Sequence, residues 1–178
     1  EKRKNVLDGI AITGGEPLLQ KDIERFLYEL KETGIAVKLD TNGSFPDRLS
    51  QIISCNLVDY VAMDNKMPCN RTWNLPGGDP LFGRFARCLN LLKNSGTPFE
   101  IRTTVHPGLL DEADILQMIR ECENLGYSGT YYLQYFFNAG FTLGNMKPPT
   151  RRYDRQLLNR HSPLAIGYRN FPEDRGKA

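Results

Sequence analysis

The chain has no long apolar run, few histidines, a single tryptophan and no closely spaced pair of cysteines. Its 178 residues include 2 His, 1 Trp and 4 Cys. No stretch reaches the roughly 18 consecutive apolar residues that a membrane-spanning helix needs, and no signal peptide opens the chain. With 40% hydrophobic and 25% charged residues, the composition excludes membrane, collagen-like and disordered classes and is typical of a globular protein.

The four cysteines lie too far apart to form a zinc ribbon or a redox pair. They stand at 55, 69, 88 and 122, and none belongs to a C-x-x-C motif. Cys88 and Cys122 fall on the apolar faces of expected helices, where we expect small buried side chains. Free thiols without a secretion signal indicate a reducing compartment, and we therefore expect a cytoplasmic protein.

The net charge of +2 is too small to indicate nucleic-acid binding, but the charge is unevenly distributed. Residues 147–178 carry 8 basic and 3 acidic side chains, whereas residues 1–146 have a net charge of −3. We expect residues 1–146 to form the folded domain. Residues 147–178 are expected to be a basic C-terminal tail, either solvated or facing an acidic partner.

Apolar strand patterns alternate with amphipathic helix patterns along the chain. Five strands, alternating with four helices, predict a parallel α/β fold, either an open doubly wound sheet or a whole or partial barrel. One further short helix is expected near residues 153–159. The expected strands are 9–13, 35–40, 58–64, 99–105 and 130–136; the four helices are 21–33, one with Pro46 in its first turn, one ended by Gly96 and one ended by Gly126.

Small or polar residues follow every predicted strand. The carboxyl ends of parallel strands are where α/β folds bind ligands, so these segments predict one common binding pocket. They are Thr13–Pro17, Asp40–Gly43, Met63–Lys66, Thr103–Gly108, and Gln134 with Asn138–Gly140.

The residue types in these segments suit a small polar ligand. Gly14 and Gly15 let a ligand approach the backbone without a Cβ in the way, and Glu16 offers an anion to an ammonium group. Asp40, Asp64 and Lys66 together could hold a ribose, a carboxylate or a cation. Each feature also has an ordinary explanation, as a turn, a helix-entry loop or a surface ion pair. His106 and Trp73 are weaker candidates for ligand contact.

Three segments, 12–19, 37–43 and 58–64, resemble the radical S-adenosylmethionine (SAM) superfamily. They read Ile-Thr-Gly-Gly-Glu-Pro-Leu-Leu, Val-Lys-Leu-Asp-Thr-Asn-Gly and Val-Asp-Tyr-Val-Ala-Met-Asp. Within the superfamily they are most similar to the activating proteins of anaerobic ribonucleoside-triphosphate reductase. Segments 100–105 and 132–136 agree, and the resemblance covers about residues 5–145. It implies a parallel (β/α) partial barrel.

The resemblance also implies which residues contact SAM. The glycine-rich motif, Gly14, Gly15 and Glu16, would hold the amino group of SAM. Four residues at the ends of the second and third strands would surround the carboxylate and ribose of SAM or a monovalent cation; they are Asp40, Thr41, Asp64 and Lys66. Arg102 and Gln134, on later strands, would face SAM from the far side. No catalytic side chain is implied.

Members of this family reduce SAM with a [4Fe–4S] cluster and release a 5′-deoxyadenosyl radical. In the activating proteins the radical abstracts hydrogen from a glycine of a partner enzyme. The resemblance therefore implies a glycyl-radical partner such as anaerobic ribonucleotide reductase and an electron donor such as flavodoxin or ferredoxin. It implies neither nucleic acid nor membrane as a partner.

The chain departs from the family pattern at its start. The family holds its cluster with three cysteines in C-x-x-x-C-x-x-C ahead of the glycine-rich motif, but the eight residues before Gly9 contain no cysteine. We therefore expect no metal ligand in this chain, a missing first βα unit, and no activity unless an upstream cluster segment completes the protein.

Several functional alternatives stay open. A domain without the cluster could bind SAM or a nucleotide, or dock a protein. A complete enzyme could instead activate pyruvate formate-lyase or catalyse a ring-forming radical SAM reaction. An unrelated phosphate-binding α/β barrel has no supporting motif.

Overall fold

The computed structural model describes residues 7–71, 81–137 and 148–172, and strands alternate with helices through them. Two short 3-10 helices, η1 (Pro17–Leu19) and η2 (Cys69–Arg71), follow the first and third strands. The strands are β1 (Gly9–Ile12), β2 (Ala36–Thr41), β3 (Tyr60–Asp64), β4 (Phe99–Val105), β5 (Tyr131–Tyr135) and β6 (Ile166–Arg169). The α-helices are α1 (Ile23–Lys31), α2 (Pro46–Ser54), α3 (Leu81–Ser95), α4 (Glu112–Asn124) and α5 (Arg155–His161).

The six strands follow one another in sequence order across the sheet. The pairs β1–β2, β2–β3, β4–β5 and β5–β6 are all parallel, so the expected parallel α/β fold is confirmed. The chain divides into two compact units. The first contains the described residues up to 65 and those from 81 to 100; the second contains residues 66–71 and the described residues from 101 on.

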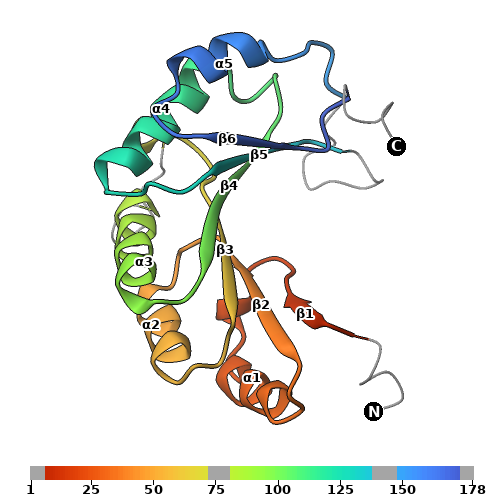
Figure 1. Cartoon of the computed structure of the whole chain (residues 1–178), viewed down its shortest axis with the longest axis vertical. Coiled ribbons are helices and arrows are strands. Elements are labelled where there is room, and N and C mark those ends of the chain that lie inside the picture. Colours follow the sequence, from red (N-terminus) through yellow and green to blue (C-terminus); the bar gives the residue numbers. More distant parts are fainter. Residues whose placement is uncertain (1–6, 72–80, 138–147, 173–178) are drawn as a thin grey trace. The chain divides into compact units, whose positions relative to one another are not determined.

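In the first unit, helices cover one face of β1–β3 (Figure 1). Alternation along β2 turns Val37 and Leu39 toward this helical side, where both are fully buried with Leu27 of α1. Helix α1 ends at Lys31, and the turn that follows contains Gly34, whose φ of +77° is a conformation that glycine adopts without strain. The sequence predicted a helix at residues 21–33, and α1 lies within two residues of these bounds at each end. It also predicted Pro46 in the first turn of the next helix, and α2 begins at Pro46.

In the second unit, α4 begins with a capping box in which Asp111 and Asp114 each accept the other's backbone N–H. Its buried side chains, Ile115, Met118 and Ile119 among them, pack as the periodicity predicts. Helices α4 and α5 lie on one side of β5 and β6 (Figure 1), and the fully buried Tyr131 and Leu133 share one face of β5.

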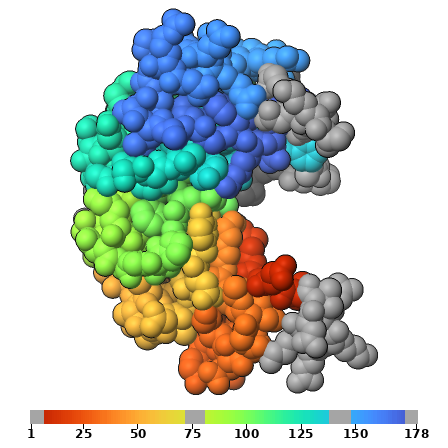
Figure 2. All heavy atoms as spheres, in the orientation of Figure 1, coloured from red at the N-terminus to blue at the C-terminus, as the bar shows by residue number. Residues whose placement is uncertain are grey.

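The structure has a sixth strand that the sequence analysis did not predict. Strand β6 pairs with β5, and the Tyr131 amide donates to the Ala165 carbonyl oxygen over 2.8 Å. In the space-filling view the blue C-terminal residues lie beside teal residues of the second unit (Figure 2), and α5 is in contact with α4. The Tyr153 hydroxyl donates to the Leu110 carbonyl oxygen over 2.8 Å. This part of the expected tail is thus folded into the second unit.

Two further findings concern the cysteines and the membrane. Cys88 and Cys122 are buried, as expected, and Cys55 and Cys69 are exposed. Within the described ranges, no helix has the length and apolar character required to cross a membrane.

Candidate functional site

The glycine-rich turn after β1 is open to a ligand. Gly14 and Gly15 are exposed, and a Cβ built on either would meet no atom within 4 Å. Gly14 has a φ of +141°, which side chains rarely tolerate. The backbone of this turn is therefore open, and the contact of Gly14 and Gly15 with SAM stays a prediction.

The Glu16 carboxylate fixes this turn to the end of β2. Glu16 is only 7% exposed. Its Oε1 accepts hydrogen bonds from the Thr41 hydroxyl (2.8 Å) and the Leu18 amide (3.1 Å), and its Oε2 accepts one from the Asn42 amide (2.7 Å). The sequence analysis interpreted Glu16 as an anion offered to a ligand and did not predict these bonds. In the structure both carboxylate oxygens accept hydrogen bonds from the chain itself. Its contact with SAM stays a prediction.

The loop after β2 is also held by local bonds. The Thr41 hydroxyl accepts the Gly43 amide over 3.2 Å, and the Ser44 amide donates to Asn42 Oδ1 over 2.9 Å. Cys88 donates through Sγ to the Gly43 carbonyl oxygen over 3.2 Å. Burial, with the nearby Glu16 charge, raises the pKa of the Cys88 thiol to about 12. The thiol therefore stays protonated and supports the loop as a donor.

Asp40 and Asp64 share the face of the first unit's sheet that lies opposite the helices. Asp40 pairs with Ala62 of β3, and strand alternation places Asp64 on the same side as Ala62. Lys38 Nζ lies 3.1 Å from Asp40 Oδ1. The expected pair of acidic residues is thus brought to one face, together with a lysine.

Two residues that the sequence analysis did not select share this polar surface with Lys38. Tyr60 pairs with Lys38, and its hydroxyl donates to Glu100 Oε2 over 3.1 Å. Glu100 is buried. Polar and apolar residues alternate in Lys38-Leu39-Asp40 and Tyr60-Val61. This alternation was the sequence signal that could have predicted a polar face of the sheet at Lys38 and Tyr60.

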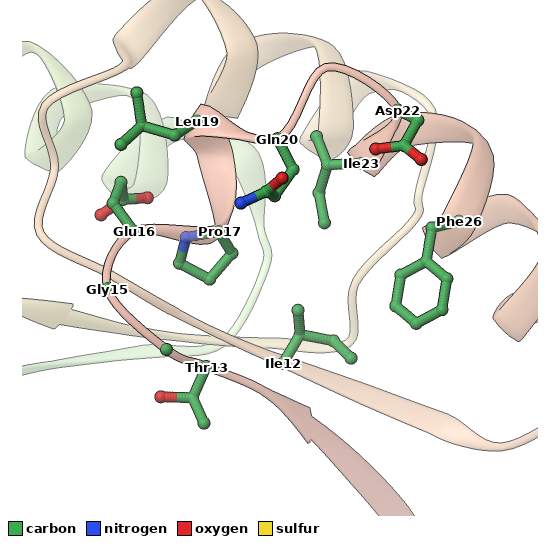
Figure 3. Close-up of a pocket in the computed structure, with 11 residues that line it drawn as sticks. Ile12, Thr13, Gly15, Glu16, Pro17, Leu19, Gln20, Asp22, Ile23 and Phe26 are labelled. Atoms are coloured by element: carbon green, nitrogen blue, oxygen red, sulfur yellow. The ribbon is translucent and has the colours of Figure 1, made fainter.

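A pocket of about 470 Å³ lies beside the glycine-rich turn (Figure 3). Ile12, Ile23 and Phe26 form apolar walls, and Gln20 and Asp22 add polar groups at its rim. Ile12 pairs with Leu39, which places it on the helical side of the sheet. The Ile12 wall of this pocket therefore lies on the opposite side of the sheet from Asp40 and Asp64.

Three of the nine predicted contact residues belong to the second unit. Arg102 of β4 is 9% exposed, Gln134 of β5 is partly exposed, and Lys66 is exposed. The register pairs Arg102 with Tyr132 and Thr104 with Gln134. Arg102 and Gln134 consequently point to the same face, the one that α4 and α5 do not cover.

Of the two weaker candidates for ligand contact, the structure describes only His106. His106 Nδ1 accepts a hydrogen bond from the Gly108 amide over 3.0 Å, which is a contact within the local turn. The His106 ring packs edge-on against Phe136, with 5.2 Å between the ring centres. Trp73 and the segment Asn138–Gly140 lie outside the described residues.

The residues present do not match the ligand set of an iron–sulfur cluster. Among residues 7–71, 81–137 and 148–172, no group of three or more His, Cys, Asp or Glu side chains is arranged to hold a metal ion. The expectation that this chain holds no cluster ligand stays a prediction.

Comparison with known proteins gives a family for the chain. The radical SAM superfamily matches over residues 1–122. A candidate glycyl-radical enzyme activating enzyme of Methanocaldococcus jannaschii is 36% identical over 125 residues, which are 65% of this chain and 52% of that protein. A 7-carboxy-7-deazaguanine synthase of Archaeoglobus fulgidus is 28% identical over 130 residues, 73% of this chain and 52% of that one.

The fold also matches a solved structure. A domain of the pyruvate-formate lyase-activating enzyme from Bacteroides vulgatus has a TM-score of 0.61 and 18% identity, over 89% of this chain and 98% of that one. At this identity the likeness shows a shared fold. The chain spans about half the length of the two relatives given above.

Proposed function

Because the chain belongs to the radical SAM superfamily, we propose that it is the SAM-binding portion of an enzyme that activates a glycyl-radical protein. The family implies SAM and a [4Fe–4S] cluster as cofactors. In this proposal the three cluster thiolates come from outside the residues described above, and the chain by itself is inactive. Its own residues bind and orient SAM. The target is an anaerobic ribonucleotide reductase, and the electron donor is a flavodoxin or ferredoxin.

The glycine-rich turn is the observation that carries the proposal. Gly14 and Gly15 present an open backbone at the carboxyl end of β1, and Glu16 ties this backbone to the end of β2. A preformed turn loses little conformational entropy when a ligand binds. Backbone carbonyls there can accept hydrogen bonds from an ammonium group such as that of SAM.

SAM binding to the chain is the first test. Gly15→Val adds a side chain where the protein leaves open space, so the variant should fold normally and block only an approaching ligand. We expect isothermal titration to show SAM binding by the unaltered chain and at least about tenfold weaker binding by the variant. Ala36→Val, at the exposed amino end of β2, is the matched control and should bind like the unaltered chain. Absence of SAM binding by the unaltered chain would contradict the proposal.

The reaction itself is tested with a version of the protein that carries a C-x-x-x-C-x-x-C segment. Reduced and supplied with SAM, it should cleave SAM and produce a glycyl radical, seen by electron paramagnetic resonance, on an anaerobic ribonucleotide reductase. A protein with a loaded cluster that does not cleave SAM would rule out the enzyme function.

The relationship to a 7-carboxy-7-deazaguanine synthase favours a second candidate, in which the same SAM-binding residues serve a small-molecule substrate. The two candidates differ in where the radical goes. SAM cleavage that depends on a small molecule, with no glycyl radical on any tested polypeptide, would favour the second.

A further inference from the structure

A second pocket of the first unit lies between the segment that joins β2 to α2 and helix α3. Helices α2 and α3 lie side by side in this unit (Figure 1). The pocket has a volume of about 370 Å³, which is within the range of small-molecule sites. Its polar lining consists of Ser44, Asp47 and Arg48 on one wall and of Arg84 and Arg87 of α3 on the other. All five residues belong to the first unit, and none is a predicted SAM contact.

The two walls of this pocket are fixed to each other by buried contacts. Cys88 of α3 donates through Sγ to the carbonyl oxygen of Gly43, the residue before Ser44, over 3.2 Å. A Cβ on Gly43 would lie 3.4 Å from two carbons of Phe85, so the backbone here packs closely on α3. Phe85 and Cys88 are buried. The pocket therefore exists before any ligand binds, which limits the entropy lost on binding.

Two of the three arginines are paired with carboxylates of the chain itself. Arg48 Nη2 lies 2.8 Å from Glu24 Oε2, and Arg48 Nη1 donates to the Leu18 carbonyl oxygen over 2.6 Å. Arg48 therefore serves to join α2 to the segment before α1. Arg87 Nη2 lies 2.9 Å from Asp47 Oδ1, but both side chains are largely exposed, with 54% and 88% of their surface accessible. Such an exposed pair contributes little stability, so Arg87 can turn to a ligand at small cost.

The third arginine, Arg84, differs from the other two. It is half-buried, as is Ser44. Within the described ranges of the chain, neither the Arg84 guanidinium nor the Ser44 hydroxyl forms an ion pair or a hydrogen bond with another residue. Arg84 and Arg87 are three residues apart on α3, so they lie on the same side of the helix, where their like charges repel. An anion between them would remove this repulsion.

The donors of the pocket suit a phosphoryl group. The planar fork of an arginine donates to two oxygens of a phosphate at once, and a serine hydroxyl can donate to a third. A phosphate monoester carries between about 1.5 and 2 negative charges at pH 7, whereas a carboxylate carries one and has only two oxygens. The volume of about 370 Å³ also leaves room for a small organic group beside the phosphoryl group.

We propose that this pocket binds a phosphoryl group, either of free phosphate or of a small phosphate monoester. Arg84 and Ser44 hold the phosphoryl oxygens, and Arg87 adds a second positive charge at the rim. The site is separate from the residues assigned to SAM, so the inference goes beyond the proposed function. SAM and the phosphorylated ligand can occupy the chain together.

The test uses the full chain in a phosphate-free buffer of low ionic strength, with excess SAM present. The probes are inorganic phosphate, glycerol 3-phosphate, glycerol and acetate. We expect the Arg84 Nε–Hε resonance, identified by its loss in Arg84→Gln, to shift with the two phosphates and not with glycerol. Tighter binding of glycerol 3-phosphate than of inorganic phosphate would identify an ester as the ligand, and equal binding would identify phosphate alone. Acetate should bind at least about tenfold more weakly than either.

Variants connect the binding to the named side chains. Arg84→Gln should bind glycerol 3-phosphate at least about tenfold more weakly, because a charge-assisted pair of hydrogen bonds is lost. Arg84→Lys keeps the charge without the fork and should give a smaller loss, and Ser44→Ala should weaken binding several-fold. Arg25→Gln is the matched control: it removes one exposed arginine of the same unit and should leave the affinity unchanged. Circular dichroism confirms that each variant is folded.

Three results would overturn the inference. Absence of binding by both phosphates would show that the pocket holds no phosphoryl group. Equal affinity for glycerol 3-phosphate in folded Arg84→Gln would place any phosphate site elsewhere. Acetate binding as tight as phosphate binding would assign the pocket to carboxylates. None of these results changes the affinity of the chain for SAM, so the proposed function is decided separately.

Discussion

Glu16 illustrates how one side chain can serve both the fold and the site. Its carboxylate accepts three hydrogen bonds, two of them from residues 41 and 42 at the end of the neighbouring strand. A buried carboxylate with several donors stabilises the turn because each donor would otherwise lose its partner. The position of the glycine-rich turn therefore depends on Glu16 before any ligand is bound.

Glu16→Gln should destabilise the protein without ligand. Glutamine presents an amide nitrogen where the Asn42 or Thr41 donor needs an acceptor, so at least one buried donor loses its partner. We expect the free energy of unfolding to fall by about 1–3 kcal/mol, measured by urea unfolding in the absence of SAM. Glu29→Gln is the control, because Glu29 forms an exposed pair with Arg25 and should matter little. Unchanged stability in Glu16→Gln would show that the turn does not need the carboxylate.

A residue-level motif search finds Glu16 and Thr41 but not the hydrogen bond between them. Thr41 lies 25 residues away along the chain and Cys88 lies 45 residues from Gly43, so their contacts depend on strand register and helix packing. Strand β6 was missed for another reason. The four-residue strand Ile166–Arg169 alternates too briefly for its pattern to stand out from a basic segment.

At the scale of elements, the ion pair between α4 and the segment before α5 should make stability depend on pH. Arg151 donates to both oxygens of Glu112 over 2.7 and 2.9 Å, and these bonds, opposed by partial burial, lower the pKa of Glu112. Because the pKa is lower in the folded state, the pair stabilises the protein above the unfolded-state pKa, and this contribution disappears as the pH falls through the folded-state pKa.

Arg151→Gln should therefore lower the free energy of unfolding at pH 7 by only about 0.5–1 kcal/mol, since the Arg151 side chain is 45% exposed and solvent screens the pair. The difference from the unaltered chain should shrink toward zero at an acidic pH below the lowered folded-state pKa of Glu112, where the carboxylate is protonated. Urea unfolding across this range measures it, with Arg25→Gln as the surface control. A difference that is the same at both pH values would show that the pair does not act through the Glu112 charge.

The C-terminal elements should be essential to the second unit. Removing residues 148–178 deletes β6 and the buried side chains of Tyr153, Leu158 and Phe171. Burial of these three side chains stabilises the folded state by roughly 5–8 kcal/mol. That is comparable with the whole stability of a small domain. We expect the Tyr131 amide, which donates to Ala165, to lose its protection from hydrogen exchange.

The matched control removes only residues 173–178 and should keep full protection of Tyr131. Amides of β2, in the other unit, serve as an internal reference in both truncated chains. Full protection of Tyr131 in a chain ending at residue 147 would mean that residues 147–178 are a dispensable tail after all.

At the scale of the whole molecule, the sequence predicted the alternation of strands and helices well. Strand 99–105 has the expected boundaries, because its apolar pattern is long and a glycine ends the helix before it. The distribution of the site residues could not be predicted in the same way. That Ile12 and Asp40 lie on opposite faces of the sheet follows from the register of β1 with β2, which no local pattern specifies.

The distribution of cysteines leads to the last prediction. The first unit contains Cys55 and Cys88, and the second contains Cys69 and Cys122; in each pair one thiol is exposed and one is buried. A site-differentiated [4Fe–4S] cluster needs three thiolates at one place. Neither unit supplies three, and the high pKa of Cys88 opposes its ionisation.

We therefore expect the chain to bind little iron when it is incubated anaerobically with iron, sulfide and a thiol reductant. A [4Fe–4S] cluster contains about four irons per chain, and the chain should retain far less than this. Iron and sulfide are measured after gel filtration, and Cys55→Ser with Cys69→Ser serves as the control for loose surface binding. The same treatment of a version with a C-x-x-x-C-x-x-C segment should yield a full cluster. A full cluster on the chain alone that disappears in the double variant would contradict the prediction, because it would require the exposed thiols to meet at one site.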